Sequence, residues 1–305
     1  MSGFEVTLIA RGAHHAAIRG EGLRLVAPDG DHRLHLPVVD HPRTLAIGAD
    51  DVVLLCMKSQ HTEAALLDLR AAAHRHTAIV CVQNGVANER IAARYFERVY
   101  GMVVVLPAVH LQPGTVVTHA ASVGGMLDVG RYPCGVDSAS TAIAEALSRA
   151  GFTSQADPRI MRLKYAKLLS NLNNALQAAV GLDVDAREVS RQLRTEALAC
   201  YAAAAIDCAS ADEMKLRLRD GPTTVAVEGM PRGGGSSWQS LARGAADMET
   251  DYLNGEITLL GRLHGVPTPA NEALQAIAAQ LIRERAQPGS LSVAQVASRI
   301  QSATG

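Results

Sequence analysis

Residues 51–83 read DVVLLCMKSQHTEAALLDLRAAAHRHTAIVCVQ, and the order of patterns in this stretch decides the fold class. Residues 51–57 are an apolar run typical of a buried strand, residues 62–73 have helical character, and residues 78–83 are a second apolar run. A strand, a helix and a strand in this order form a crossover unit, which makes the two strands parallel. We therefore predict an α/β fold built on a parallel sheet.

The alternation of strands and helices continues on both sides of this stretch. We predict strands at residues 5–10 and 99–106, helices at 13–19 and 88–95, and an antiparallel hairpin from residues 115–118 and 126–129 at the edge of the sheet. After Asp157-Pro158 the strand signals stop, and helices are predicted at 159–180, 186–208, 247–264 and 270–285, with one short helix in the tail. We expect a Rossmann-type domain over residues 1–156 and an all-helical domain over residues 157–305.

Composition excludes several classes of function. The chain has 48% apolar and 19% charged residues, which are globular values, and its net charge of −1 argues against nucleic-acid and anionic-membrane partners. No membrane-length apolar run and no signal peptide is present, so a cytoplasmic protein is expected. Its five cysteines are scattered and its histidines lack metal-ligand spacing, so we predict neither a disulfide framework nor a metal site.

The N-terminal residues resemble the second strand of a dinucleotide-binding domain. Such a domain opens with a strand, a G-x-G-x-x-G turn and a helix, and no such motif occurs near GFEVTLIARG at residues 3–12. We expect a segment of roughly 25–30 residues to come before this strand, and we favour a misplaced start or a shortened chain over a natural truncation. Without that segment, neighbouring strands would have exposed apolar edges.

Arg11 ends this strand, at the position that distinguishes two cofactors. An acidic residue there binds the ribose hydroxyl of NAD, whereas an arginine pairs with the 2′-phosphate of NADP. Arg11 on its own is better explained as a surface residue at a strand end. With the motifs described next, it predicts NADP.

A polar stripe runs along the first predicted helix of the second domain. Residues 164–174 read KYAKLLSNLNN, and the polar positions Lys164, Lys167, Asn171 and Asn174 are spaced three or four residues apart, beside a separate leucine face. A stripe of ammonium and amide groups suits an anionic, carbonyl-bearing small molecule. It also suits a plain solvated face.

Three further motifs accompany the stripe. Met57-Lys58-Ser59-Gln60 and Val82-Gln83-Asn84-Gly85 each end a predicted strand, which is where open α/β sheets bind ligands. Ser236-Ser237-Trp238-Gln239 precedes Glu249-Thr250-Asp251-Tyr252-Leu253-Asn254-Gly255, where Glu249 shares a helix face with leucines and is expected to point inward. Each motif alone has an ordinary structural explanation as a helix cap, a turn or a surface charge.

Together, in this order, the motifs resemble the ketopantoate reductase (2-dehydropantoate 2-reductase) family over about residues 5–288. The resemblance implies reduction of the ketone of 2-dehydropantoate by NADPH, which forms pantoate for pantothenate and coenzyme A synthesis. Lys167 matches the general acid that protonates the carbonyl oxygen, and Lys164 is its rival for that role.

The resemblance also implies roles for the other motif residues. Glu249 matches a catalytic-site glutamate that hydrogen-bonds the substrate hydroxyl, and Asn171 and Ser237 match substrate-binding residues. Asn84 and Lys58 match residues at the junction of cofactor and substrate, and Arg11 matches the 2′-phosphate ligand. A possible homodimer is expected through the helical domain.

Two departures from the family pattern loosen the substrate prediction. Trp238 follows the serines where the family often has methionine, and Asn174-Ala175 stands where the family often has Asn-Pro. The alternatives are therefore a paralogous reductase of another 2-oxo or 3-oxo acid, and a truncated remnant without catalytic activity.

Overall fold

The computed structural model describes residues 2–230 and 233–304, and the chain forms two compact units. The first unit comprises the described residues of 1–83, 88–161 and 211–232, and the second those of 84–87, 162–210 and 233–305. The main division, after Met161, lies close to the boundary predicted after residue 156. Two exchanges between the units were not predicted from the sequence. Residues 84–87 group with the helical unit, and the described residues of 211–232 group with the sheet unit.

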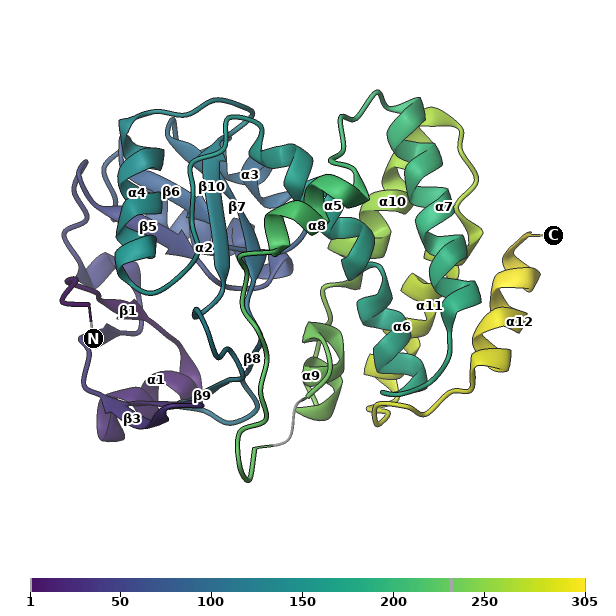
Figure 1. Ribbon diagram of the computed structural model, residues 1–305, viewed down its shortest axis with the longest axis horizontal. Coiled ribbons are helices and arrows are strands. Elements are labelled where there is room, and N and C mark those ends of the chain that lie inside the picture. The colour runs from purple at the N-terminus through teal and green to yellow at the C-terminus, as the bar shows by residue number, and fades with distance from the viewer. Residues whose placement is uncertain (1, 231–232, 305) are drawn as a thin grey trace. The chain divides into compact units, whose positions relative to one another are not determined.

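The predicted parallel sheet forms the centre of the first unit (Figure 1). Strands β5 (Val52–Leu55), β6 (Ala78–Cys81) and β7 (Val99–Val105) are parallel, and β10 (Met126–Arg131) pairs antiparallel with β7, in the order β10-β7-β6-β5. Helix α2 (Thr62–Arg70) connects β5 to β6. The predicted α/β fold class is therefore confirmed.

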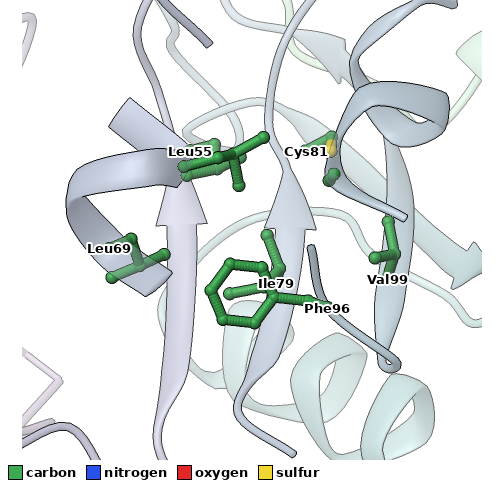
Figure 2. Close-up of a cluster of buried hydrophobic side chains, with 8 residues drawn as sticks. Leu55, Leu69, Ile79, Cys81, Phe96 and Val99 are labelled. Atoms are coloured by element: carbon green, nitrogen blue, oxygen red, sulfur yellow. The ribbon is translucent and has the colours of Figure 1, made fainter. Parts of the chain in front are cut away.

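Helices cover both faces of this sheet because successive strand residues point to opposite sides. Figure 2 shows one face, where Ile79 and Cys81 of β6 lie with Leu55 and Val99, and Leu69 of α2 and Phe96 pack over them. On the other face, Ala78 and Val80 pack with residues of α4 (Ser138–Arg149). Complete burial of each large aliphatic side chain contributes about 1.5–3 kcal/mol to stability, so β6 anchors both layers.

The predicted hairpin of residues 115–118 and 126–129 is wrong. Strand β9 (Thr115–Thr118) belongs to a separate sheet of order β3-β2-β9-β8, with β2 (Leu23–Ala27), β3 (Gly30–Leu34) and β8 (Ala108–Val109), whereas β10 pairs with β7. The apolar pattern identified both strands correctly. It contains no information on which partner each strand takes, because that pairing is long-range.

The first predicted strand is shorter than expected. Strand β1 (Leu8–Ile9) pairs in parallel with β4 (Val38–Val39), outside the four-stranded sheet. Strand β5 lies at the edge of that sheet, and its residues Val52 and Leu54 are 44% and 45% exposed. Ile9 is 41% exposed. The two strands therefore present apolar side chains to solvent.

The second unit is helical, as predicted, and its described residues contain no β-strand. Its helices are α5 (Ile160–Asn171, whose first two residues group with the first unit), α6 (Asn173–Val180), α7 (Arg187–Ala203), α9 (Ser236–Ala242), α10 (Thr250–His264), α11 (Pro269–Arg283) and α12 (Val293–Thr304). The single helix predicted over residues 159–180 is divided at Leu172 into α5 and α6. No helix among the described residues has the length and apolar character needed to cross a membrane.

A buried ion pair fastens residues 211–232 to the first unit. Arg217, on helix α8 (Ala211–Leu218), contacts both carboxylate oxygens of Asp128 at 2.5 Å, and Asp128 on β10 is fully buried. The backbone N–H of Gln155 also donates to Asp128, at 3.0 Å. Because a buried carboxylate is costly without a cationic partner, Arg217 holds α8 against the sheet of the first unit.

We predict that Arg217→Met lowers the free energy of unfolding by about 3–5 kcal/mol, because it leaves the Asp128 carboxylate buried without its partner. Urea denaturation measures the change. The double variant Asp128→Leu/Arg217→Met is expected to recover much of the loss, since it removes both charges. Arg219→Met, at an exposed arginine two residues away, serves as the matched control. A loss for Arg217→Met no larger than for Arg219→Met would contradict this account.

Candidate functional site

A buried polar network joins the ends of β5 and β6. The Gln83 side-chain amide donates to the Met57 carbonyl at 2.8 Å and to Thr62 Oγ1 at 2.7 Å. Thr62 Oγ1 in turn donates to Asn88, whose side-chain amide donates to Ser59 Oγ at 2.9 Å. The network fixes the backbone at the predicted motif residue Lys58, which precedes the short 3₁₀ helix η2 (Ser59–His61). Thr62 and Asn88 were not predicted to take part.

Asn84 and Gly85 pack with the helical unit. Gly85 has a φ of +79°, and a Cβ there would lie 3.1 Å from the Tyr252 carbonyl oxygen and 3.6 Å from Leu253 Cδ2. Only glycine accepts this combination of left-handed backbone and close approach without strain. The half-buried Asn84 is thereby placed next to the first turn of α10.

Arg11 lies at the surface, directly after β1 and before helix α1 (Gly12–Glu21). Its side chain is 59% exposed and its guanidinium lies 2.6 Å from a carboxylate oxygen of Asp68 on α2. His41 Nε2 lies 3.5 Å from the other oxygen of the same carboxylate. Exposed pairs of this kind contribute about 0–1 kcal/mol, so an anion with more charge than a carboxylate can compete for Arg11.

The polar stripe on α5 is largely buried. The apolar face packs as predicted, with Leu168, Leu169, Leu172 and Leu176 all at most 4% exposed. Lys164 is 3% and Asn171 is 4% exposed, whereas Lys167 is half-buried. The stripe is therefore not an ordinary solvated helix face.

Lys167 is a cation in a poorly solvated position. Its ammonium nitrogen lies 3.4 Å from Ser170 Oγ. Burial lowers the pKa of Lys167 below the ordinary lysine value, because removal from water disfavours the charged form. A lysine of lowered pKa gives up its proton more readily than a surface lysine, which suits a general acid.

Glu249 immediately precedes the first turn of α10 and is 5% exposed. The inward orientation predicted from the leucines on its helix face agrees with this burial. The N-terminus of a helix stabilises a nearby carboxylate, which offsets part of the cost of burying it.

The break between α5 and α6 is tied to α10 by Asn254. The side-chain amide of Asn254 donates to the Leu172 carbonyl at 3.1 Å and to Asn271 Oδ1 at 3.1 Å. A side chain that donates a hydrogen bond to a main-chain carbonyl oxygen of a helix can interrupt the helix at that point. The contact brings the helix that follows Glu249 against the end of the helix that carries Asn171.

Asn271 continues this network to a buried carboxylate. Glu196 on α7 accepts hydrogen bonds from the backbone N–H groups of Ala270 and Asn271, at 2.8 and 3.1 Å, and from the Asn271 amide at 2.7 Å. Burial raises the pKa of the Glu196 carboxyl, and these donors oppose the rise. Sequence reasoning missed Glu196 and Asn271 and regarded Asn254 as structural, since local patterns do not reveal contacts made across three helices.

Ser237 lies in the first turn of α9 and is 1% exposed. The preceding segment rests on α6, where the Asn174 amide lies 3.3 Å from Ser236 Oγ. Asn174 follows Asn171 by three residues, across the break at Leu172, so Ser237 lies on a helix that contacts α6, the helix directly after the one that carries Asn171.

Several buried polar atoms of these helices have no hydrogen-bond partner within the described part of the chain. They are Asn171 Nδ2, Asn173 Oδ1, Ser237 Oγ, Thr250 Oγ1 and Asn254 Oδ1. Buried polar groups are nearly always paired, so a cluster of unpaired ones marks a place that a ligand can satisfy. Two of the five atoms belong to residues that the sequence predicted to bind substrate.

The helical unit offers a poorly solvated ammonium on α5, buried donors at Asn171 and Ser237, and a buried carboxylate at the start of α10. Such a set can bind a small anion and protonate an oxygen that becomes negative during reaction. Across residues 2–230 and 233–304, no group of three or more histidine, cysteine or acidic side chains is placed to hold a metal ion.

Comparisons with known proteins give a consistent result. The sequence pattern of the ketopantoate reductase PanE/ApbA family matches residues 1–133, and that of the family's C-terminal region matches residues 159–282. A 2-dehydropantoate 2-reductase of Mesorhizobium japonicum is 28% identical over 92% of this chain and 91% of its own length. Another from Halobacterium salinarum is 27% identical over 88% of both chains.

Solved structures share the fold. A PanE/ApbA family ketopantoate reductase from Ralstonia eutropha superimposes with a TM-score of 0.75 at 28% identity, covering 93% of this chain and 92% of its own. A D-mandelate dehydrogenase determined with NADH and anilino(oxo)acetate has a TM-score of 0.78 at 23% identity, covering 93% of each chain. The latter likeness concerns the fold alone.

We predict that Lys167 titrates below pH 10.5, the ordinary lysine value, because burial disfavours its charged form. The sequence contains four lysines, so NMR of protein labelled with ¹³C at lysine Cε resolves each titration. Lys167→Arg assigns the signal by its disappearance. A Lys167 midpoint at or above 10.5 would mean that the ammonium is well solvated.

Proposed function

The chain belongs to the ketopantoate reductase PanE/ApbA family, and we propose that it uses NADPH to reduce the ketone of a small 2-oxo acid. The leading substrate is 2-dehydropantoate, whose reduction gives pantoate. The named relatives that cover most of the chain support this choice, and their identity of 27–28% leaves room for a related 2-oxo acid.

The observation that carries the proposal is the pair of buried donors Asn171 Nδ2 and Ser237 Oγ. Neither has a partner among the described residues. Ser237 lies on α9, which contacts α6, and Asn171 ends α5 directly before α6 begins. An unpaired buried donor costs about 1–3 kcal/mol, and this cost is removed when an anionic oxygen binds. A 2-oxo acid offers a carboxylate and a ketone oxygen to such donors.

Lys167 is the proposed general acid. Reduction turns the ketone into an alkoxide, and an ammonium within reach stabilises the developing charge and transfers its proton to that oxygen. Its lowered pKa makes this transfer easier. Asn171, one helical turn further along α5, is placed to orient the same substrate.

Glu249 is proposed to accept a hydrogen bond from the substrate hydroxyl. Its carboxylate is buried at the start of α10, and Asn254 holds that helix against the end of α5. A fixed acceptor next to two fixed donors selects a substrate with a hydroxyl group beside its oxo acid.

The residues of the first unit fit the nucleotide. NADPH, when bound, supplies the hydride. Arg11 would hold its 2′-phosphate, because the guanidinium is exposed and its pair with Asp68 is weak enough to exchange. Lys58 and Asn84, at the two strand-end motifs, would contact the cofactor near the substrate.

We predict that Lys167→Ala lowers kcat by roughly 10²–10⁴-fold, the usual contribution of a general acid. In the unmodified enzyme, kcat should fall as pH rises through the lowered pKa of Lys167, since only the protonated form donates. The loss of NADPH absorbance on oxidation measures both. Lys215→Met, at an exposed lysine, is the control. A larger loss for Lys164→Met than for Lys167→Ala would transfer the role to Lys164.

A substrate panel tests the reaction itself. We expect saturable quenching or enhancement of NADPH fluorescence on binding, and turnover of 2-dehydropantoate in preference to other 2-oxo and 3-oxo acids. Preference for a bulkier or smaller acid would identify a paralogous reductase. The Trp238 side chain, next to Ser237, is then the first place to seek the cause. Absence of saturable NADPH binding would refute the proposed enzymatic activity.

A further inference from the structure

The segment that leads into α9 is fastened to α6 by Gln177. The backbone N–H of Gly235 donates to Gln177 Oε1 at 2.7 Å, and the Asn174 amide lies 3.3 Å from Ser236 Oγ one residue later. Gln177 is half-buried, and neither it nor its bond to Gly235 belongs to the sequence motifs. We call these two hydrogen bonds, with residues 174, 177, 235 and 236, the α6–α9 clasp.

The clasp closes only because two glycines precede α9. A Cβ on Gly234 would lie 2.5 Å from Trp238 Cγ and 3.0 Å from Gln177 Oε1. A Cβ on Gly235 would lie 3.0 Å from Asn174 Oδ1. Side chains at these positions would push the segment away from α6, so the glycines permit the close approach that the hydrogen bonds then hold.

Ser237 receives its position from this clasp. It is the second residue of α9, two residues after Gly235, and its buried hydroxyl has no partner among the described residues. The N-cap position of α9, Gly235, has no capping side chain, so the bond to Gln177 is a principal restraint on the start of the helix.

The same clasp also relates the position of Ser237 to that of Asn171. Gln177 lies on α6, which follows α5 after the single residue Leu172, and Asn254 fixes the Leu172 carbonyl. Asn171 directly precedes the break that Asn254 fixes, and Ser237 lies on the helix that the clasp fastens to α6, although 66 positions separate 171 from 237 in the sequence.

We propose that Gln177 is a positioning residue, which sets the Ser237 hydroxyl relative to Asn171 so that both donors meet one substrate carboxylate. Gln177 itself does not contact the substrate. The proposal rests on the proposed function, because it takes a 2-oxo acid as the ligand. It goes beyond that function by assigning the geometry of the acid-binding donors to a residue outside the motifs.

Gln177→Met keeps the size of the side chain and removes the acceptor for Gly235. Because one hydrogen bond typically contributes enough for about a tenfold change in affinity, we expect the Kd of 2-dehydropantoate and its KM to rise roughly tenfold. The kcat should stay within about twofold, since Lys167 is untouched. Calorimetry gives Kd without turnover. Gln301→Met, at an exposed glutamine of α12, is the matched control and should change neither value.

A double-mutant cycle separates positioning from general loosening of the fold. If Gln177 acts through Ser237, then Gln177→Met adds little to Kd in a protein that already carries Ser237→Ala. Independent, multiplicative effects of the two changes on Kd would overturn the proposal, as would a fall in kcat at constant KM. Amide hydrogen exchange should show loss of Gly235 protection in Gln177→Met alone, and unchanged protection would also overturn it.

The outcomes for the unmodified protein distinguish the two proposals. Binding of 2-dehydropantoate without turnover would refute the proposed reaction. The role of Gln177 would then still be decided by the double-mutant cycle with Ser237→Ala, which is measured by Kd. Absence of binding of 2-dehydropantoate and of every other 2-oxo acid in the panel would overturn both, whatever the state of the clasp.

Discussion

The hydrogen bond from Asn254 to the Leu172 carbonyl is the constraint on which the helical unit depends. It divides what would be one long helix into α5 and α6, and it holds α10 against the break. Through Asn271 it extends to the Glu196 carboxylate, which receives the first N–H groups of α11. Three helices are thereby fixed around the residues between Asn171 and Asn174. A buried network of this kind enforces one geometry, and Asn254 Oδ1 is the atom of it that has no partner among the described residues.

The helical unit contains two sorts of buried polar group, and the contrast separates structure from function. Glu196 and Asn271 have partners within the protein and hold helices together. Asn171 Nδ2 and Ser237 Oγ, within the described residues, have none. The fold gives the Glu196 carboxylate three donors and leaves Asn171 Nδ2 and Ser237 Oγ without a protein partner among the described residues, which favours a ligand as their partner. The lowered pKa of Lys167 belongs to the same poorly solvated region of α5.

Sequence periodicity predicted those parts of the fold that depend on neighbours along the chain. The runs at β5, β6 and β7 gave the parallel sheet, and the leucine spacing gave the buried face of α5. Sequence periodicity does not show which distant strands pair. The sequence therefore predicted a hairpin of β9 and β10, although the two strands lie in different sheets. The division of the helix at Leu172 depends on Asn254, 82 residues away. In the candidate site, the motifs predicted Lys167, Asn171, Ser237 and Glu249, which stay predictions, whereas Gln177 was not predicted because a glutamine within a helix has no distinctive pattern.

The ion pair between Asp128 and Arg217 has a consequence for the history and engineering of this chain. The described residues of 211–232 belong to the sheet unit although they lie between segments of the helical unit, so a chimera joined once near residue 156 would exchange only part of each unit. The Asp128 of one parent would then face residue 217 of the other. We expect such a chimera to keep its stability where both parents carry this ion pair.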